Sequence, residues 1–504
     1  SMIGMTSLGY LHLFRLFDEN PAVSPERIFT DTEQTHHSSQ DVELMGFSFS
    51  FEFDFLGVFK MLDKHNIPRR AAERDGNAPL VFGGGPVLTA NPEPYADFFD
   101  FIIVGEGEEI VEEIIQAYQE VRTATNRREK LVRLAQIEGV YVPSLYEPEY
   151  NPDYTIKAYR KAEEAPEKIN KRYIKAYGES VYTPIITPKS VFSNMFMIET
   201  SRGCPKMCRF CIASYLTLPS RYPYLESVKQ AIGLGLEHTG KLGFLGALIT
   251  EHPDFEEICR YILEKRREKE FEISVSSLRV DKITPLIIQT LVKCGQKQTT
   301  IAVEAGSERL RKVINKNLKE EDIFKGVQIA RENGLKGLKV YGMIGLPTET
   351  DEDIYALADL MIRLKKENKG FNLTLSVSSF VPKAQTPFQW EERPSNSTIE
   401  AKSAILRREL NTHKIIYKPT SVKWDYIQAI LSRGDRRLSA LLEKVYEFGG
   451  TIGSWNRAYK VLSYENIPDY DWYALRKRPH NEVLPWDIID TGISRETLIK
   501  SSRY

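Results

Sequence analysis

Three cysteines lie within eight residues of one another, and their spacing limits the chemistry of this chain more than any other feature. Cys204, Cys208 and Cys211 form the pattern C-x3-C-x2-C, in a loop with glycine and proline that follows an apolar, strand-like run. Thiolates are the usual protein ligands of iron–sulfur clusters. Three cysteines leave one iron of a four-iron cubane open, and open metal positions are typical of catalytic sites. The motif therefore predicts a 4Fe-4S cluster with an exchangeable position.

A zinc knuckle or a disulfide is the alternative interpretation of the motif. Zinc normally takes four ligands in paired spacing, and no second Cys or His pair follows closely. The chain has five cysteines, and the other two, Cys259 and Cys294, lie in helix-like apolar contexts. This use of cysteine favours a reducing compartment.

With Phe210 directly before the third cysteine, the motif resembles the radical S-adenosylmethionine (SAM) superfamily. The resemblance implies that Cys204, Cys208 and Cys211 each hold one iron. It also implies that the amino and carboxylate groups of SAM chelate the fourth. The reduced cluster would cleave the sulfonium and give a 5′-deoxyadenosyl radical. An electron donor such as flavodoxin or ferredoxin is then required.

The composition is that of a globular protein with two to four domains. The 504 residues are 42% hydrophobic and 27% charged, with a net charge of −1. Such a balance gives no global basic field for nucleic acid. We expect no membrane span, because no apolar run is long enough. The N-terminus lacks the charged segment of a signal peptide, so we expect a cytoplasmic location.

Residues 1–145 alternate strand and helix and predict a Rossmann-like domain with a parallel sheet. Its glycine-rich turns, residues 83–85 and 105–109, follow short apolar strands, where such folds bind ligands. The arrangement resembles the cobalamin-binding-type domain that precedes many radical SAM domains. However, His36 and His37 lack the Asp-x-His-x-x-Gly signature, and the first strand is expected to be missing. Cobalamin binding, and a domain that no longer binds it, are both left open.

The rest of the chain divides into three parts. Residues 146–190 are expected to be an extended linker, and residues 391–504 a mainly helical, aromatic region whose aromatic side chains pack against the protein or stack on bases. Residues 191–390 predict a partial, TIM-like (β/α)6 barrel, with its active site at the carboxyl ends of the strands. Those strands are predicted to end near Thr200, Leu245, Ser276, Val303, Met343 and Ser379.

The second and third barrel strands supply four candidate cofactor residues. Radical SAM domains carry a small-residue turn after the second strand, whose backbone meets the amino group of SAM. The resemblance gives this role to Gly246 and Ala247. At the third strand, Ser276 and Arg279 are further candidates. A guanidinium there could pair with a carboxylate or phosphate, or form a surface salt bridge.

The fourth and fifth barrel strands supply four more candidate cofactor residues. Glu304 matches the family acid that hydrogen-bonds the ribose hydroxyls, and Ser307 matches a polar contact to the methionine end. The alternative for Glu304 is an acid at the N-terminus of the next helix. Met343 and Ile344 match the strand end that holds the adenine.

These features predict a radical SAM enzyme, and methylation of an unactivated carbon if cobalamin is bound. Radical SAM modification of RNA or protein without cobalamin, and a non-catalytic iron–sulfur sensor or scaffold, are the alternatives. Methylthio transfer is disfavoured, because it needs a second cluster and residues 1–190 contain no cysteine. Residues 434–437 and 484–492, with Gly450 and Trp455, resemble an uncharacterised bacterial family. The substrate (small molecule, RNA or protein) and the oligomeric state are not predicted.

Overall fold

The computed structural model describes residues 2–31, 42–462 and 467–504, so His36 and His37 lie outside the described residues. The N-terminal part forms a four-stranded sheet in the order β1-β2-β3-β4, parallel except for the last pair. Its strands are β1 (Leu44–Ser48), β2 (Leu80–Gly84), β3 (Phe101–Ile103) and β4 (Val140–Tyr141). The helices of this part are α1 (Leu8–Glu19), α2 (Phe55–Lys64), α3 (Pro86–Ala90), α4 (Ile110–Val121) and α5 (Arg127–Ala135).

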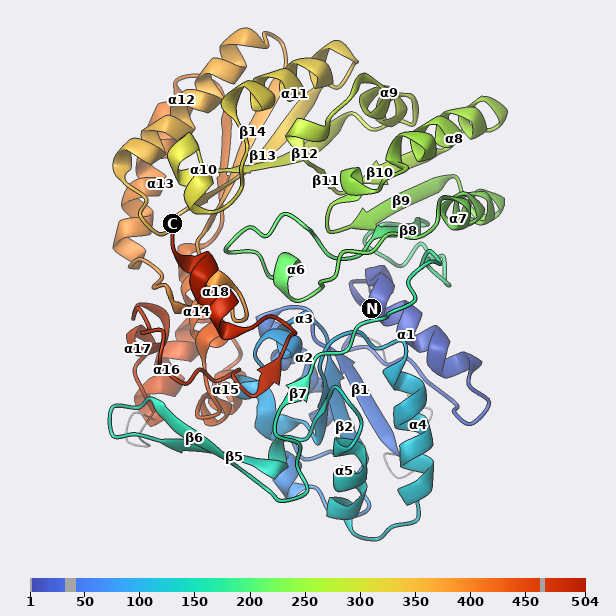
Figure 1. Cartoon of the computed structure of the whole chain (residues 1–504), viewed down its shortest axis with the longest axis vertical. Coiled ribbons are helices and arrows are strands. Elements are labelled where there is room, and N and C mark those ends of the chain that lie inside the picture. The colour runs from blue at the N-terminus through green and yellow to red at the C-terminus, as the bar shows by residue number, and fades with distance from the viewer. Residues whose placement is uncertain (1, 32–41, 463–466) are drawn as a thin grey trace.

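The central part forms an open barrel of parallel strands with helices on its outer side (Figure 1). Three strands form one sheet, β8 (Phe196–Ser201), β9 (Lys241–Gly246) and β10 (Glu272–Val275). Five form the next, β11 (Ser277–Leu278), β12 (Gln298–Glu304), β13 (Gly337–Ile344), β14 (Asn372–Ser379) and β15 (Ile416–Pro419). The predicted mixed α/β fold with parallel sheets is therefore confirmed. β15 adds a strand that the pattern did not predict.

The barrel helices follow their strands in regular alternation. They are α6 (Ile212–Tyr215), α7 (Leu225–His238), α8 (Phe255–Glu268), α9 (Pro285–Lys293), α10 (Glu308–Val313), α11 (Glu320–Glu332), α12 (Asp351–Glu367) and α13 (Asn396–Asn411). Thr350 and Asp353 form a capping box that starts α12, because each side chain accepts a hydrogen bond from the other residue's backbone N–H. The polar residues after β13 thus set where the next helix begins.

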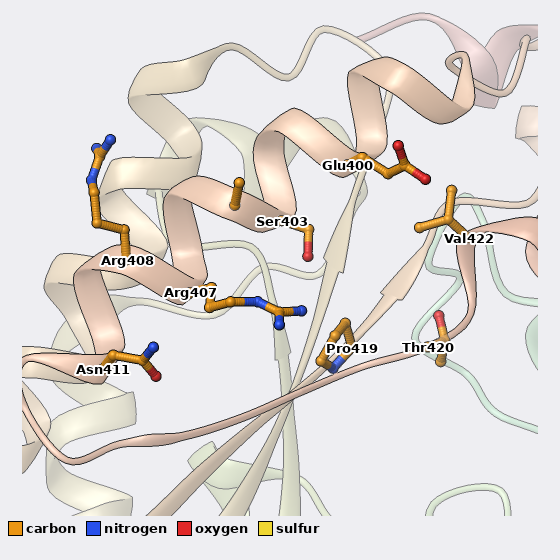
Figure 2. A pocket seen from close by; sticks show the side chains of 9 residues that line it. Glu400, Ser403, Arg407, Arg408, Asn411, Pro419, Thr420 and Val422 are labelled. Carbon is orange, nitrogen blue, oxygen red and sulfur yellow. The ribbon is translucent and has the colours of Figure 1, made fainter.

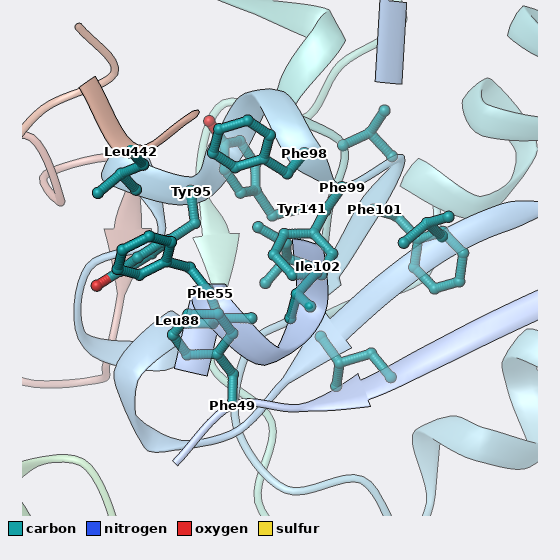
Figure 3. Packing of buried hydrophobic residues seen from close by; sticks show 14 of the residues in the cluster. Phe49, Phe55, Leu88, Tyr95, Phe98, Phe99, Phe101, Ile102, Tyr141 and Leu442 are labelled. Atoms are coloured by element: carbon teal, nitrogen blue, oxygen red, sulfur yellow. The ribbon is translucent and has the colours of Figure 1, made fainter. Parts of the chain in front are cut away.

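The C-terminal helices pack against the N-terminal sheet (Figure 1). They are α14 (Val422–Arg433), α15 (Leu438–Glu447), α16 (Ile452–Leu462) and α17 (Tyr470–Ala474). One hydrophobic core joins Phe55 and Tyr95 to Leu442 and Trp455 (Figure 3). The rings of Phe55 and Trp455 meet edge to face at 6.2 Å. Trp455, Tyr459, Tyr470, Trp472 and Tyr473 belong to this core or pack against it, which favours the packing alternative for these side chains. Tyr464 lies outside the described residues.

Residues 146–190, expected to be an extended linker, contain short strands. β5 (Tyr146–Tyr150) and β6 (Ile156–Lys161) form an antiparallel hairpin. β7 (Ile169–Asn170) pairs with β16 (Ile489–Asp490), and α18 (Arg495–Ser502) follows β16. The domain boundaries themselves stay a proposal. Within the described residues, no helix is both long and apolar enough to cross a membrane.

Candidate active site

The cysteine loop, residues 202–211, leaves the carboxyl end of β8 and leads into α6. Cys208 is buried, Cys204 and Cys211 are half-buried, and all three thiols are free. Gly203 has a φ of +81°, and a Cβ on it would lie 2.4 Å from the carbonyl oxygen of Thr217. Only glycine avoids both the strain and this contact. The conformation of the cysteine loop therefore requires glycine at position 203, directly before the first cysteine.

The loop is held from outside by the segment that follows α10. The Asn315 side-chain amide donates to the carbonyl oxygens of Met207, at 2.8 Å, and Lys206, at 3.3 Å. The backbone N–H of Arg209 donates to Ile314 O at 3.0 Å. The Tyr215 hydroxyl also donates to Met207 O, at 3.1 Å. These bonds fix the backbone between the cysteines, so that the three side chains keep a set direction.

The electrostatic surroundings of the thiols are mixed. Burial raises the pKa of the Cys208 thiol to about 11, and it raises the pKa of Cys211 as well. The nearby Lys316 ammonium acts in the opposite direction on both thiols. Burial thus disfavours the thiolate forms of Cys208 and Cys211, and a metal cluster that binds there must displace the thiol protons.

The thiol set fits a cubane cluster better than a single ion. In the part of the chain that the structure describes, no three Cys, His, Asp or Glu side chains are grouped as ligands of one metal ion. A cubane differs from such an ion, because each of its cysteines binds a different iron. Three free thiols on one loop are the kind of donors that a cluster with one open iron would need.

Glu304 ends β12 beside the cysteine loop. Its φ of 69° is left-handed, and a register shift between Ala302 and Glu304 marks a bulge in the pairing with β13. The Glu304 side chain is 12% exposed, and its carboxylate lies 3.4 Å from the ammonium of Lys316. The left-handed backbone thus places the Glu304 side chain at the strand end, near Cys208 of the cysteine loop. Such outliers are typical of functional sites.

The small-residue turn after β9 lies against the end of β8. A Cβ on Gly246 would lie 2.1 Å from the Ser201 hydroxyl oxygen, which is buried and has no hydrogen-bond partner among the described residues. Ala247 follows and is exposed. Ser276 is exposed as well, at the break between β10 and β11. An unpaired buried hydroxyl beside a glycine is suited to a polar ligand.

Four other predicted residues have roles inside the protein. Arg279 is buried, with Nε 2.8 Å from the carboxylate of Asp281, and it donates to Lys316 O at 3.1 Å. Ser307 caps α10 by accepting from Leu310 N at 3.1 Å, and it donates to Asp353. Met343 and Phe210 of the cysteine loop both pack against a small cluster that contains Phe380 and Phe388. Ile344 points to the opposite side, into the core under the helices.

A buried ion-pair network joins the cysteine loop to the N-terminal sheet, and sequence reasoning missed it. Arg202, at the start of the loop, pairs with Glu199 and Glu108, each at 2.7 Å. Arg221 donates to the Glu106 carboxylate at 2.7 Å, and Glu106 also lies 3.4 Å from Arg202. These carboxylates raise the pKa of Arg202 against the effect of burial. The acidic turn, residues 105–109, therefore holds the loop.

The glycines of the two N-terminal turns approach the chain's own backbone and side chains. A Cβ on Gly85 would lie 2.4 Å from Phe49 O, and one on Gly105 would lie 2.1 Å from Arg172 O. A Cβ on Gly107 would lie 2.7 Å from the side chain of Leu13. Protein atoms thus fill the space that the glycines were expected to leave for a ligand.

A separate pocket lies on the helix side of the barrel, away from this chemistry. It is lined by residues of α13 and of the segment after β15, among them Ser403, Arg407 and Thr420 (Figure 2). The Ser403 hydroxyl is 2.8 Å from that of Tyr417 in β15. The pocket therefore opens on the outer side of the strand and is not part of the candidate site.

A parallel α/β barrel with three free thiols in the loop after its first strand defines a class of iron–sulfur proteins with one open iron. The chain belongs to the radical SAM superfamily. The family model for the radical SAM superfamily matches residues 198–361, and the model for radical SAM proteins, N-terminal, matches residues 16–143.

Relatives of this chain are found in archaea. It is 30% identical over 400 residues to an uncharacterized protein of Methanocaldococcus jannaschii, with 78% of each chain covered. A putative methylthiotransferase of the same organism is 26% identical over 276 residues, which are 52% of this chain and 53% of that protein. Among solved structures, the cobalamin-dependent SAM radical enzyme OxsB with aqua-cobalamin bound matches with a TM-score of 0.46 and 13% identity, over 91% of this chain and 70% of that one.

Proposed function

We propose that this chain is a radical SAM enzyme whose own residues bind a 4Fe-4S cluster and SAM at the carboxyl ends of the barrel strands. The observation that carries the proposal is the single fixed loop with three free thiols, beside the buried acid Glu304. When bound, cluster and cofactor supply a 5′-deoxyadenosyl radical that takes hydrogen from an unactivated carbon. An external one-electron donor, such as flavodoxin or ferredoxin, is required. The five free cysteines support a reducing, cytoplasmic location.

Different residues of the site would bind the cluster and the different parts of SAM. Cys204, Cys208 and Cys211 would hold three irons. The Glu304 carboxylate would accept hydrogen bonds from the ribose hydroxyls, and the Lys316 ammonium lies 3.4 Å from it. The small turn at Gly246 would let the methionine moiety approach the backbone, and Met343 would contact the adenine from the inner side. Ala247, Ser276, Arg279 and Ser307 are proposed as more distant contributors to the same site, whereas Ile344 would act only by packing the strand that carries Met343.

Cleavage of SAM tests this function against that of a non-catalytic sensor. The reconstituted, reduced protein is expected to form 5′-deoxyadenosine and methionine, and the formation of both is followed by chromatography. A sensor needs no cofactor site, so a fully loaded and reduced cluster without any cleavage would leave only a redox or scaffold role. Methylthio transfer is not proposed, since residues 1–190 contain no cysteine for a second cluster.

Replacing Glu304 with glutamine is expected to keep the cluster and weaken the binding of SAM. Glutamine keeps an acceptor oxygen but removes the charge. A hydrogen bond to a charged group contributes roughly 1–1.5 kcal/mol more than one to a neutral group, so the affinity should fall about fivefold to tenfold. Calorimetry with SAM measures the affinity, and the visible spectrum measures the cluster. Glu308→Gln is the matched control, because Glu308 is an exposed acid at the start of α10. Equal affinities of both variants would assign Glu304 to the helix end alone.

Cobalamin-dependent methylation of an unactivated carbon is the second candidate, and the predicted N-terminal sheet motivates it. The filled glycine turns favour the enzyme without a corrin. We therefore expect no binding of hydroxocobalamin or methylcobalamin at tens of micromolar, an affinity of roughly −6 kcal/mol. The measurement is the change in the corrin absorption spectrum on titration with the protein. A saturable change would support the second candidate instead.

A further inference from the structure

The inner face of the five-stranded sheet, opposite its helices, is unusually polar. In β13 and β14, Leu338, Val340, Leu373 and Leu375 point outward into the core under the helices. Because side chains alternate along a strand, the residues between them point inward. The inward set is Thr300 and Ala302 from β12, Lys339, Tyr341 and Met343 from β13, and Thr374, Ser376 and Ser378 from β14.

β15 extends the same face. The Tyr417 hydroxyl meets Ser403 of α13 on the helix side, so Ile416 and Lys418 point inward. The pairing register aligns Tyr341 with Ser376, and Ser376 with Lys418, in one row across three strands. Lys339 lies in the adjacent row. Ile416 is 55% exposed and Tyr341 39% exposed, which shows that the face is open to solvent.

The charge on this face is positive and is not balanced by acids. The only acid in strands β12 to β15 is Glu304, and it pairs with Lys316. Among the described residues, neither Lys339 nor Lys418 forms an ion pair with a carboxylate; the recorded contact of Lys339 is with the Tyr341 ring, at 4.8 Å from the ring centre. Two lysine ammonium groups without acidic partners would thus face any molecule that enters the barrel.

We infer that the substrate carries a phosphate group, which Lys339 and Lys418 bind on this inner face; the inference rests on the proposed radical SAM function. Lysine binds phosphate as a point charge, whereas planar carboxylates are typically recognised by arginine forks. The inward residues of these strands include no arginine, and the hydroxyls of Tyr341 and Ser376 lie between the two lysines as further donors.

The position suits a substrate of the proposed reaction. Met343, the candidate adenine contact, lies two residues beyond Tyr341 on the same side of β13. Two residues of a strand span about 7 Å. A phosphate held beside Tyr341 would therefore leave the rest of the substrate within reach of the cofactor at the strand ends.

Calorimetric titration of the protein with inorganic pyrophosphate, with its cluster loaded and left oxidised, tests this inference. We expect saturable binding, and an affinity about tenfold lower in Lys339→Met and in Lys418→Met, since each removes a charged donor. Lys369→Met is the matched control, because Lys369 is an exposed lysine in the turn after α12. Acetate is the control anion and should bind more weakly than pyrophosphate.

A mixed-sequence single-stranded RNA of about ten nucleotides separates the two sources of phosphate. Tighter binding of the RNA than of pyrophosphate, lost in both variants, would mean a nucleic-acid substrate. Binding of pyrophosphate alone would mean a small phosphorylated substrate. Wild-type affinity in both lysine variants, acetate binding equal to pyrophosphate, or no binding of either phosphate probe would overturn the inference. The titration needs no reduction or SAM, so its outcome is independent of whether SAM is cleaved.

Discussion

The Cys208→Ala protein is expected to contain no 4Fe-4S cluster and to form no 5′-deoxyadenosine above background. Cys208 would supply one of three thiolates, and alanine leaves one iron without its ligand while the backbone on both sides of the position stays fixed. Cys204→Ala and Cys211→Ala should behave in the same way. Iron and sulfide analysis after anaerobic reconstitution, with the visible spectrum, measures the loss.

Cys259→Ala is the matched control for these variants. Cys259 is also buried and free, but it lies in the core between the barrel strands and their outer helices. Its replacement should cost some stability and leave the cluster intact. A full cluster in the Cys208→Ala protein would contradict the assignment of the loop as the cluster site.

Glu106→Ala is expected to destabilise the protein by about 3–5 kcal/mol, because it leaves Arg221 buried without its carboxylate. The side chains of Glu106 and Arg221 are 13% and 9% exposed, so water cannot substitute for the lost partner. The cysteine loop should loosen as well, since Arg202 loses one of its acids. Thermal unfolding measures the stability, and protease cleavage within residues 202–221 reports the loosening.

Glu109→Ala separates the network from the general effect of removing an acid. Glu109 belongs to the same turn, but its side chain is 44% exposed and 3.5 Å from Arg172. Exposed pairs contribute about 1 kcal/mol or less, so this variant should unfold close to the wild type. Similar losses in both variants would show that the buried network has no special role.

The barrel was predictable because its signals are local. The barrel strands contain short apolar stretches, some of which end in glycine or a polar residue, as at Gly246 and Glu304, and helical patterns lie between them. The spacing of the cysteines is local too. β15 carries no such signal, because its four residues include a proline and a lysine. The hairpin of β5 and β6 could not be predicted, because its residues are mostly polar and charged and give no apolar strand pattern.

The partners of the acidic turn could not be predicted from the sequence. Residues 105–109 resemble a ligand-binding turn, since glycines there let a large group approach. In the structure that group is the chain itself, through Arg172 at Gly105 and Arg221 at Glu106. These contacts join residues 67 and more positions apart, and only the folded arrangement brings them together. The shared core of Phe55 and Trp455 is of the same kind.

That shared core has a consequence for how the protein is made. The N-terminal sheet leaves the ribosome early, but Phe55 and Tyr95 remain uncovered until Leu442 and Trp455 have been synthesised. At about 5–20 residues per second, the interval between residues 145 and 442 lasts roughly 15–60 s. During that time the nascent N-terminal part exposes an aromatic surface, to which chaperones can bind and through which the chain can aggregate. Expression of this protein should therefore respond strongly to the rate of translation through the barrel.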